Sequence, residues 1–246
     1  MDPRLSVIGE RLEEVARIIV VCSGKGGVGK SLVASLSSLL SSRSGLRVGL
    51  LDLDFHGPSC HIILGAQKAS LLEDRGLVPP TVAGVRLMSL AFFAGDKPIP
   101  LRGADVTNAL LELLAITRWG RLDLLIVDSP PGMGEEILDV ARILRRAEAL
   151  LVTTPSPLSL STVSRLVQLL KSLRTPIVGV LENMRREEEG EVAREARRWG
   201  IRYLGWLPYD PEIEAAIGDP ARLLSTQLAR RLGEVLREAG ILARSM

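Results

Sequence analysis

The chain has 246 residues, of which 46% are hydrophobic and 24% are charged, and its formal net charge is +2. This composition excludes a disordered or low-complexity chain and predicts a soluble protein with an aliphatic core. The small net charge gives no reason to expect nucleic acid as a partner, and no apolar run is long enough to suggest a membrane partner.

The length suits a single α/β domain over residues 1–246, because no linker or internal repeat divides the chain. The first residues lack the uninterrupted apolar core of a signal peptide. Two cysteines, Cys22 and Cys60, offer no disulfide framework, and Cys22 is expected to be a small core residue. We therefore expect a cytoplasmic protein with reduced thiols.

Residues 24–31 form the first informative segment and read Gly-Lys-Gly-Gly-Val-Gly-Lys-Ser. They fit the phosphate-loop pattern of Gly, four residues, Gly, Lys, then Ser or Thr. The apolar run 18–22 before them predicts a buried strand, and a helical pattern begins at Ser31. Because strand, loop and helix stand in the required order, the sequence predicts a nucleoside triphosphate site rather than a flexible glycine turn.

The residue types of this loop suit a triphosphate. Glycines let several backbone N–H groups approach the phosphates closely. Lys30 would supply positive charge to the β and γ phosphates, and the Ser31 hydroxyl would ligate Mg²⁺. The residues expected to contact the nucleotide here are Gly24, Lys25, Gly26, Gly27, Val28, Gly29, Lys30, Ser31 and Leu32.

Acids and an amide follow three later apolar runs. Asp52 and Asp54 follow 48–51, Asp128 follows 122–127, and Asn183 stands just beyond 177–181. In an open parallel sheet, ligands bind beyond the carboxyl ends of the strands. Any one of these acids could instead cap a helix, but several ending near a phosphate loop favour a metal and nucleotide site.

Each of these side chains has an expected role. Asp128 begins a switch-like segment, 128–134, and would hold Mg²⁺ through water, while Gly132 would offer a free N–H to the γ-phosphate. Asp54 would orient or deprotonate the attacking water. Asp52 is the second candidate for that task and is more readily interpreted as an anchor of the switch or part of the magnesium shell. The expected metal residues are Ser31, Asp52, Asp54 and Asp128.

Asn183 bears on the identity of the base. A carboxamide donates and accepts at once, which suits the N6 and N7 edge of adenine, by analogy with nucleic-acid recognition. Guanine-binding relatives present Asn-Lys-x-Asp, which residues 182–185 lack. The sequence therefore favours ATP over GTP, although Asn183 could also simply end a strand.

Taken together, residues 25–31, 52–59, 128–132, 152–155 and 182–184 resemble the Mrp/ApbC branch of the MinD-like P-loop ATPases. The resemblance covers nearly the whole chain, and Arg102-Gly103 and Trp119-Gly120 also fit it. It implies a doubly wound, mainly parallel sheet with helices on both faces, and slow hydrolysis of ATP to ADP and phosphate by a homodimer. In that family the lysine at position 25 reaches the partner's nucleotide, so Lys25, Lys30, Asp54 and Asp128 are the expected catalytic residues. Residues 207–211 correspond to a segment that lies against the base, which makes Pro208 and Asp210 expected contacts.

Members of that branch are described as iron–sulfur cluster carriers that hold the cluster with a paired Cys-x-x-Cys. At that place this chain has the charged stretch 185–191, so the usual thiolate ligands are missing and a bound cluster is doubtful. Cys60, flanked by His56 and His61, is the remaining candidate ligand near a switch. The resemblance still implies iron–sulfur client proteins as possible partners.

Two other interpretations stay open. One is a MinD- or ParA-like positioning ATPase acting on a membrane or DNA surface, for which a C-terminal apolar stripe is the candidate anchor. That stripe, which core docking would equally explain, consists of Leu228, Leu232, Val235, Leu236 and Leu242. The other is an adaptor that uses nucleotide only as a conformational ligand. The sequence names no client and does not show whether dimerisation needs ATP.

Overall fold

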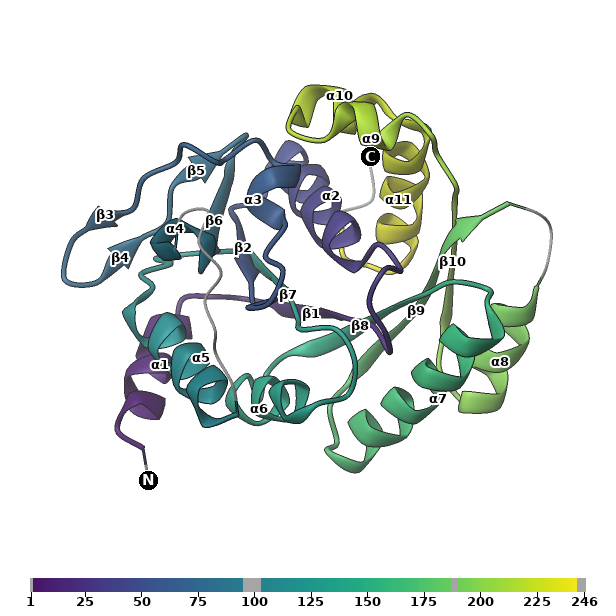
Figure 1. The fold of residues 1–246 in the computed structure, drawn as a ribbon, viewed down its shortest axis with the longest axis horizontal. Helices are drawn as coiled ribbons and strands as arrows, with labels where there is room; N and C mark the ends of the chain where they lie inside the picture. The colour runs from purple at the N-terminus through teal and green to yellow at the C-terminus, as the bar shows by residue number, and fades with distance from the viewer. Residues whose placement is uncertain (1, 95–102, 187–189, 243–246) are drawn as a thin grey trace.

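The computed structural model describes residues 2–94, 103–186 and 190–242. Arg102 and residues 187–189, which bear on the family comparison above, lie outside these ranges. Within the described residues, eight strands form one sheet in the order β10-β9-β8-β1-β7-β2-β6-β5, and β3 and β4 form a separate hairpin (Figure 1). All neighbouring pairs in the large sheet are parallel except β5 with β6.

The strands are β1 (Ile18–Cys22), β2 (Val48–Asp52), β3 (Leu72–Glu73), β4 (Leu77–Val78), β5 (Thr81–Val82), β6 (Val85–Ser89), β7 (Leu124–Asp128), β8 (Glu148–Thr153), β9 (Ile177–Arg185) and β10 (Tyr203–Pro208). The helices are α1 (Arg4–Leu12), α2 (Lys30–Arg43), α3 (Cys60–Ile63), α4 (Ala91–Ala94), α5 (Ala104–Ile116), α6 (Glu135–Ile143), α7 (Pro157–Ser172), α8 (Glu191–Trp199), α9 (Ile213–Ala216), α10 (Pro220–Ser225) and α11 (Gln227–Glu238).

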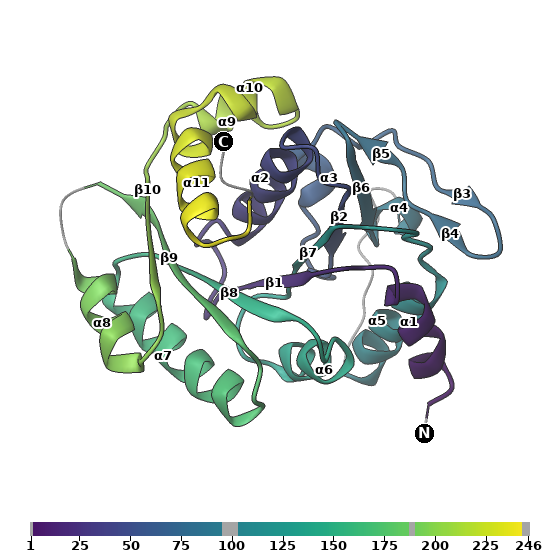
Figure 2. The ribbon, with the colours of Figure 1, turned by 180° about the vertical axis from the view of Figure 1, so that it is seen from behind.

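Helices cover both faces of the sheet. Apolar residues of α1, α5, α6, α7 and α8 belong to one buried core, and those of α2, α3, α9, α10 and α11 belong to the other (Figures 1 and 2). The central strands β1, β2 and β7 are buried at every residue, as expected of parallel strands covered on both faces. The predicted doubly wound, mainly parallel fold is confirmed.

Strand register places the ends of β2 and β7 side by side. β7 lies between β1 and β2, and Asp52 is the direct neighbour of Asp128 across the β2–β7 ladder. The loop that joins β1 to α2 leaves the sheet at the same edge. The fold therefore gathers the phosphate loop and both carboxylates at the carboxyl ends of three adjacent strands.

Three predicted strand boundaries were wrong, and the simplest case is β2, which includes the Asp52 predicted to follow it. The run predicted to end at 181 continues to Arg185, so Asn183 lies inside β9, because β10 pairs with β9 as far as Pro208 opposite Arg185. The run predicted over 122–127 instead begins at Leu124 and includes Asp128. In each case pairing with the neighbouring strand continues through a polar residue that hydropathy alone places after the strand.

The C-terminal apolar stripe packs in the core. Four of its residues, Leu228, Leu232, Val235 and Leu236, lie on α11, are at most 3% exposed, and share a core with α2 and β10. Leu242 beyond the helix is buried as well. No helix in the described ranges is long and apolar enough to cross a bilayer. The stripe is thus explained by core docking.

We expect Leu232→Ala to lower the free energy of unfolding by about 2–5 kcal/mol, because it leaves a cavity beneath a fully buried leucine. Urea denaturation measures the change. Gln227→Ala, at the exposed start of the same helix, is the matched control and should change stability by less than about 0.5 kcal/mol. Equal effects of the two substitutions would contradict the docking of α11.

Candidate functional site

The loop between β1 and α2 needs glycine at specific positions. Gly29 caps α2 with φ +82°, and a Cβ there would lie 2.3 Å from Asn183 Nδ2. Gly27 also has a left-handed backbone, with φ +77°. At Gly24 a Cβ would lie 2.6 Å from Thr162 Oγ1 on α7. The loop is therefore held tightly between α7 and β9: dihedral angle and space both require glycine at Gly29, space requires it at Gly24, and dihedral angle favours it at Gly27.

Lys30 and Asp128 form a buried ion pair at the base of this loop. Lys30 Nζ lies 2.5 Å from Asp128 Oδ1, and the two side chains are 6% and 0% exposed. Burial alone would lower the pKa of Lys30, but the charge and hydrogen bond of Asp128 outweigh it and raise that pKa. Lys30 is thus held charged in the interior and oriented by the carboxylate that ends β7.

Asp52 fastens the segment that follows β2. Its Oδ1 accepts a hydrogen bond from Asp54 N at 3.2 Å, and its Oδ2 accepts from Ser59 N at 3.0 Å and Cys60 N at 3.1 Å. These hydrogen bonds hold residues 54–60 against the end of β2, and whether Asp52 anchors a switch or joins a magnesium shell stays a prediction. Burial and the charge of Asp128 raise the pKa of Asp52 to about 7, because two adjacent carboxylates share one ammonium group.

Asp54 and Lys25 are more accessible than this inner group. Asp54 is half-buried, and its Oδ1 accepts a hydrogen bond from Gly57 N at 3.1 Å. Lys25 is also half-buried and has no ion-pair partner in the described part of the chain. Both side chains stand where a ligand can reach them, so their predicted catalytic roles stay open to experiment.

The expectation that Gly132 has a free N–H is wrong for this conformation. Gly132 N donates a hydrogen bond to Ser23 O at 3.1 Å, which ties the 128–134 segment to the phosphate loop. Its φ of +93° explains why glycine stands there. A contact between Gly132 and a phosphate would first require this hydrogen bond to break.

Asn183 reaches the phosphate loop from β9. Its Nδ2 donates to Val28 O at 2.9 Å, while its Oδ1 is buried and lacks a hydrogen-bond partner among the described residues. A buried acceptor without a donor is costly, which makes this oxygen a natural place for an N–H group of a ligand. The free oxygen fits the accepting half of the predicted adenine contact, whereas the donating half is occupied by Val28 O in this conformation.

Pro208 and Asp210 lie beyond the neighbouring strand. Pro208 ends β10, opposite Arg185. Both oxygens of Asp210 accept backbone hydrogen bonds, Oδ1 from Glu212 N at 3.1 Å and Oδ2 from Leu228 N at 3.0 Å. Asp210 thus clamps the start of α11 to the end of β10, a structural role that the sequence did not indicate, and its contact with a base stays a prediction.

The two cysteines occupy different environments. Cys22 is a core residue of β1, as expected. Cys60, the remaining candidate cluster ligand, begins α3 and is fully buried, with Sγ 3.6 Å from Asp128 Oδ2. In this conformation the thiol faces inward, so it offers no ligand at a surface between two subunits. Cys60 and Asp128 are 68 positions apart in the sequence, so no local pattern predicts their contact.

The residues present fit a magnesium nucleotide. Besides the free Asn183 oxygen and the close glycine cradle, the Ser31 hydroxyl contacts Asp128 closely enough to lower its pKa, although burial is the larger effect and raises that pKa overall. Hydroxyl and carboxylate oxygens are the donors that Mg²⁺ prefers. The site can therefore bind phosphates and a hard divalent cation.

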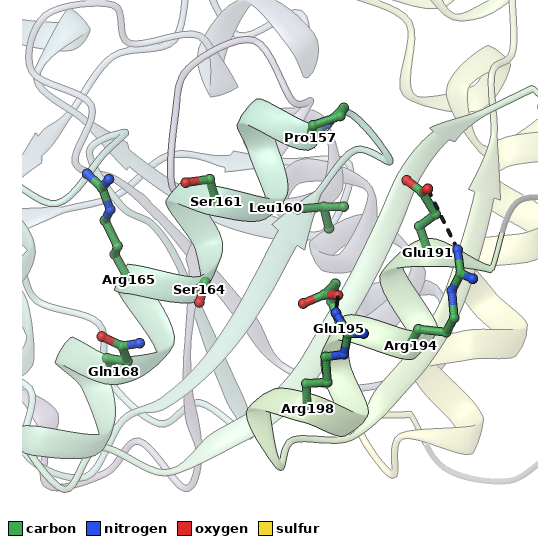
Figure 3. Close-up of a pocket in the computed structure, with 10 residues that line it drawn as sticks. All are labelled: Pro157, Leu160, Ser161, Ser164, Arg165, Gln168, Glu191, Arg194, Glu195 and Arg198. Carbon is green, nitrogen blue, oxygen red and sulfur yellow. Dashed lines mark hydrogen bonds and ion pairs between the residues drawn. The ribbon is translucent and has the colours of Figure 1, made fainter.

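A groove between α7 and α8 lies apart from these groups (Figure 3). One wall carries Ser161, Ser164 and Arg165, and the other carries Arg194 and Arg198, which pair with acids one turn away on their own helix. Exposed pairs of this kind contribute little energy and are typical of a solvated helix. The groove therefore does not compete with the phosphate loop as the functional site.

A family model described as "ParA: NUBPL iron-transfer P-loop NTPase" matches residues 14–239. An iron–sulfur cluster carrier protein of Pyrococcus abyssi is 32% identical over 96% of this chain and 92% of its own length. One of Aquifex aeolicus is 35% identical over 83% of this chain, which spans 60% of that relative.

Solved structures of nucleotide-binding proteins share the fold of this chain. A nucleotide-binding protein of Archaeoglobus fulgidus, in complex with ADP and with Co found, has a TM-score of 0.77 at 30% identity, covering 90% of this chain and 93% of its own. The septum site-determining protein MinD of Pyrococcus horikoshii, with Mg-ADP, has a TM-score of 0.68 at 21% identity over 93% of this chain and 99% of its own, a likeness of fold.

We expect Gly29→Ala to weaken ATP binding by at least about tenfold, because a left-handed alanine costs about 1–3 kcal/mol and its Cβ would displace Asn183. Titration with a fluorescent ATP analogue measures the loss. Gly9→Ala, in α1 with open space around its Cβ, is the matched control and should bind normally. Unchanged affinity in Gly29→Ala would show that the loop does not need this conformation.

Proposed function

Because this chain belongs to the family of NUBPL-type iron-transfer P-loop NTPases, we propose that it is a cytoplasmic, magnesium-dependent ATPase whose single domain, residues 1–246, switches conformation as a homodimer in iron–sulfur cluster assembly. The observation that carries the proposal is the buried group at the sheet edge, in which Lys30, Asp128 and Asp52 meet beneath the phosphate loop.

Binding of ATP requires Lys30 to exchange partners. In this conformation its ammonium group pairs with Asp128, and the β and γ phosphates of ATP would attract it away. Ser31 and Asp128 would then hold Mg²⁺, with Asp52 and Asp54 in the surrounding shell. When bound, the metal ion would neutralise phosphate charge and fix the orientation of the phosphate oxygens.

Asp54 is the residue we assign to the attacking water. Its carboxylate is accessible, and it lies on the segment that Asp52 fastens to β2. Hydrolysis or loss of the γ-phosphate would therefore alter the contacts of Asp54 and Asp52, and these contacts hold residues 54–60 in place. This connection supports a switch in which hydrolysis relaxes the segment after β2.

Two further residues complete the proposed active site. Lys25, half-buried and unpaired within the described ranges, would reach the nucleotide of a second subunit and stabilise charge that develops during phosphoryl transfer. Asn183 would accept a hydrogen bond from adenine through its free oxygen. Both assignments favour an ATP-bound homodimer as the active form.

The cargo is proposed from the relatives, which are named iron–sulfur cluster carrier proteins. This chain has no Cys-x-x-Cys, and both of its cysteines are buried. Cluster binding needs thiolate ligands, so we propose that the chain acts on iron–sulfur client proteins as a nucleotide-driven assembly factor rather than by holding a cluster in the family's usual way.

The alternatives receive less support. A positioning ATPase would need a surface anchor, whereas the candidate stripe on α11 is buried against β10 and α2. A non-hydrolysing adaptor would have no use for Asp54 beside the phosphate loop. The MinD-like structures below 25% identity share the fold, which is common to all of these functions.

We expect Asp54→Ala to lower the ATPase rate by about a hundredfold or more while ATP still binds, because it removes the group that positions water. Phosphate release and nucleotide titration measure the two quantities separately. Lys30→Ala should abolish binding itself.

Asp54→Asn is the control for structure. Its amide oxygen can still accept the hydrogen bond from Gly57 N, so it should fold normally and remain as inactive as Asp54→Ala. Hydrolysis at the parent rate in either Asp54 variant would refute the assignment.

Anaerobic reconstitution with iron and sulfide tests the cargo. We expect a colourless product without stoichiometric sulfide, because the chain lacks the paired surface thiols that relatives of this type use. Visible absorption and quantification of iron and sulfide provide the measurement. A brown protein with matching iron and sulfide would contradict this expectation and restore cluster carriage.

A further inference from the structure

Asp52, Cys60 and Asp128 meet in the interior with the donor set of a transition-metal site. One ligand atom from each lies within 4.8 Å of the other two, and all three side chains are buried. We call these three residues the acid–thiol site. The family resemblance assigns magnesium to oxygen ligands and gives Cys60 no role, so this thiol is unexplained by the proposed ATPase.

The spacing between the thiol and one carboxylate suits coordination. Cys60 Sγ lies 3.6 Å from Asp128 Oδ2. With metal–sulfur and metal–oxygen bonds of about 2.3 and 2.1 Å, the edge of a tetrahedral site is also about 3.6 Å. The ligand oxygen of Asp52 would have to move in by about 1.2 Å at most to reach the same spacing. Three protein ligands would leave a fourth position open.

Lys30 does not block this arrangement. It pairs with Oδ1 of Asp128, whereas Cys60 faces Oδ2. The two carboxylates carry two negative charges and Lys30 returns one positive charge. A divalent cation bound by the ionised thiol would make the whole buried group neutral, which removes the penalty of an uncompensated interior charge.

A buried hydroxyl beside the sulfur is a second observation. Burial and the charges of Asp52 and Asp128 raise the pKa of the Cys60 thiol well above its ordinary value, whereas contact with the hydroxyl of Ser35, a fully buried residue of α2, favours the ionised form. That hydroxyl has no hydrogen-bond partner of good geometry within the described residues. A buried donor aimed at sulfur has a clear use once the sulfur carries charge.

We propose that the acid–thiol site binds one thiophilic divalent transition-metal ion, of the iron(II), cobalt(II) or zinc(II) class, through Cys60 Sγ and one oxygen each of Asp52 and Asp128. On binding, the metal–sulfur bond replaces the S–H bond and the thiol proton passes to solvent, with no change in oxidation state. A thiolate selects such an ion over magnesium. The proposal deepens the iron–sulfur assembly function proposed above. The biological role of the metal ion rests on that function, whereas the existence of the site rests on the geometry alone.

Cobalt(II) is the probe, added anaerobically to untagged full-length protein. We expect one equivalent to give a thiolate-to-cobalt charge-transfer band in the near ultraviolet, together with visible bands of a tetrahedral ion. Cys60→Ser should abolish the charge-transfer band and weaken cobalt binding by at least about tenfold. Asp52→Asn, which keeps the thiol and the side-chain shape, should also weaken binding.

Cys22→Ser is the matched control, because Cys22 is the other buried cysteine and lies in the opposite core. It should keep the band at full intensity. Absence of the band in the parent protein, or its persistence in Cys60→Ser, would overturn the proposal. Titration with a fluorescent ATP analogue on the same samples separates the two ideas: normal nucleotide binding without the band refutes the metal site alone, and a band without nucleotide binding refutes the ATPase alone.

Discussion

The structure depends on placing two carboxylates side by side at the ends of adjacent buried strands. Asp52 and Asp128 are direct neighbours across the β2–β7 ladder, and both are almost fully buried. Such a pair is unfavourable unless cations and N–H donors compensate it. Lys30 supplies the cation, and the backbone after β2 supplies the donors, so the chemistry of the pair fixes the positions of both the phosphate loop and the following segment.

This constraint explains how ligand binding could move the protein. The Lys30 that would meet phosphate is the same residue that neutralises Asp128, and the Asp52 beside it holds residues 54–60. Removing Lys30 from Asp128 leaves excess negative charge among buried groups, which must be met by a metal ion or a proton. Phosphate binding, metal binding and the conformation after β2 are therefore linked through one electrostatic balance.

The fold and the location of the site could be predicted from the sequence because both depend on local patterns. Buried apolar runs, the glycine-rich loop and the acids at strand ends can each be recognised within about ten residues of sequence. The contacts within the site could not be recognised in this way. The Gly132–Ser23 hydrogen bond, the Asp210 clamp on α11 and the Cys60–Asp128 contact join residues that are 18 to 109 positions apart, so the tertiary fold and not the local sequence brings them together.

Cys60 shows how a departure from a family pattern can be interpreted physically. A chain that has lost a surface Cys-x-x-Cys loses the ligands of a shared cluster, but the loss says nothing about a single ion inside each subunit. The interior thiol lies against the carboxylate that the proposed ATPase uses for magnesium, and the ammonium group beside it is the one that would respond to phosphate. A metal ion held there would be coupled by charge to the nucleotide in the same subunit, without requiring a dimer interface. The buried acid–thiol site could thus connect iron handling to ATP binding in a chain that lacks the usual ligands.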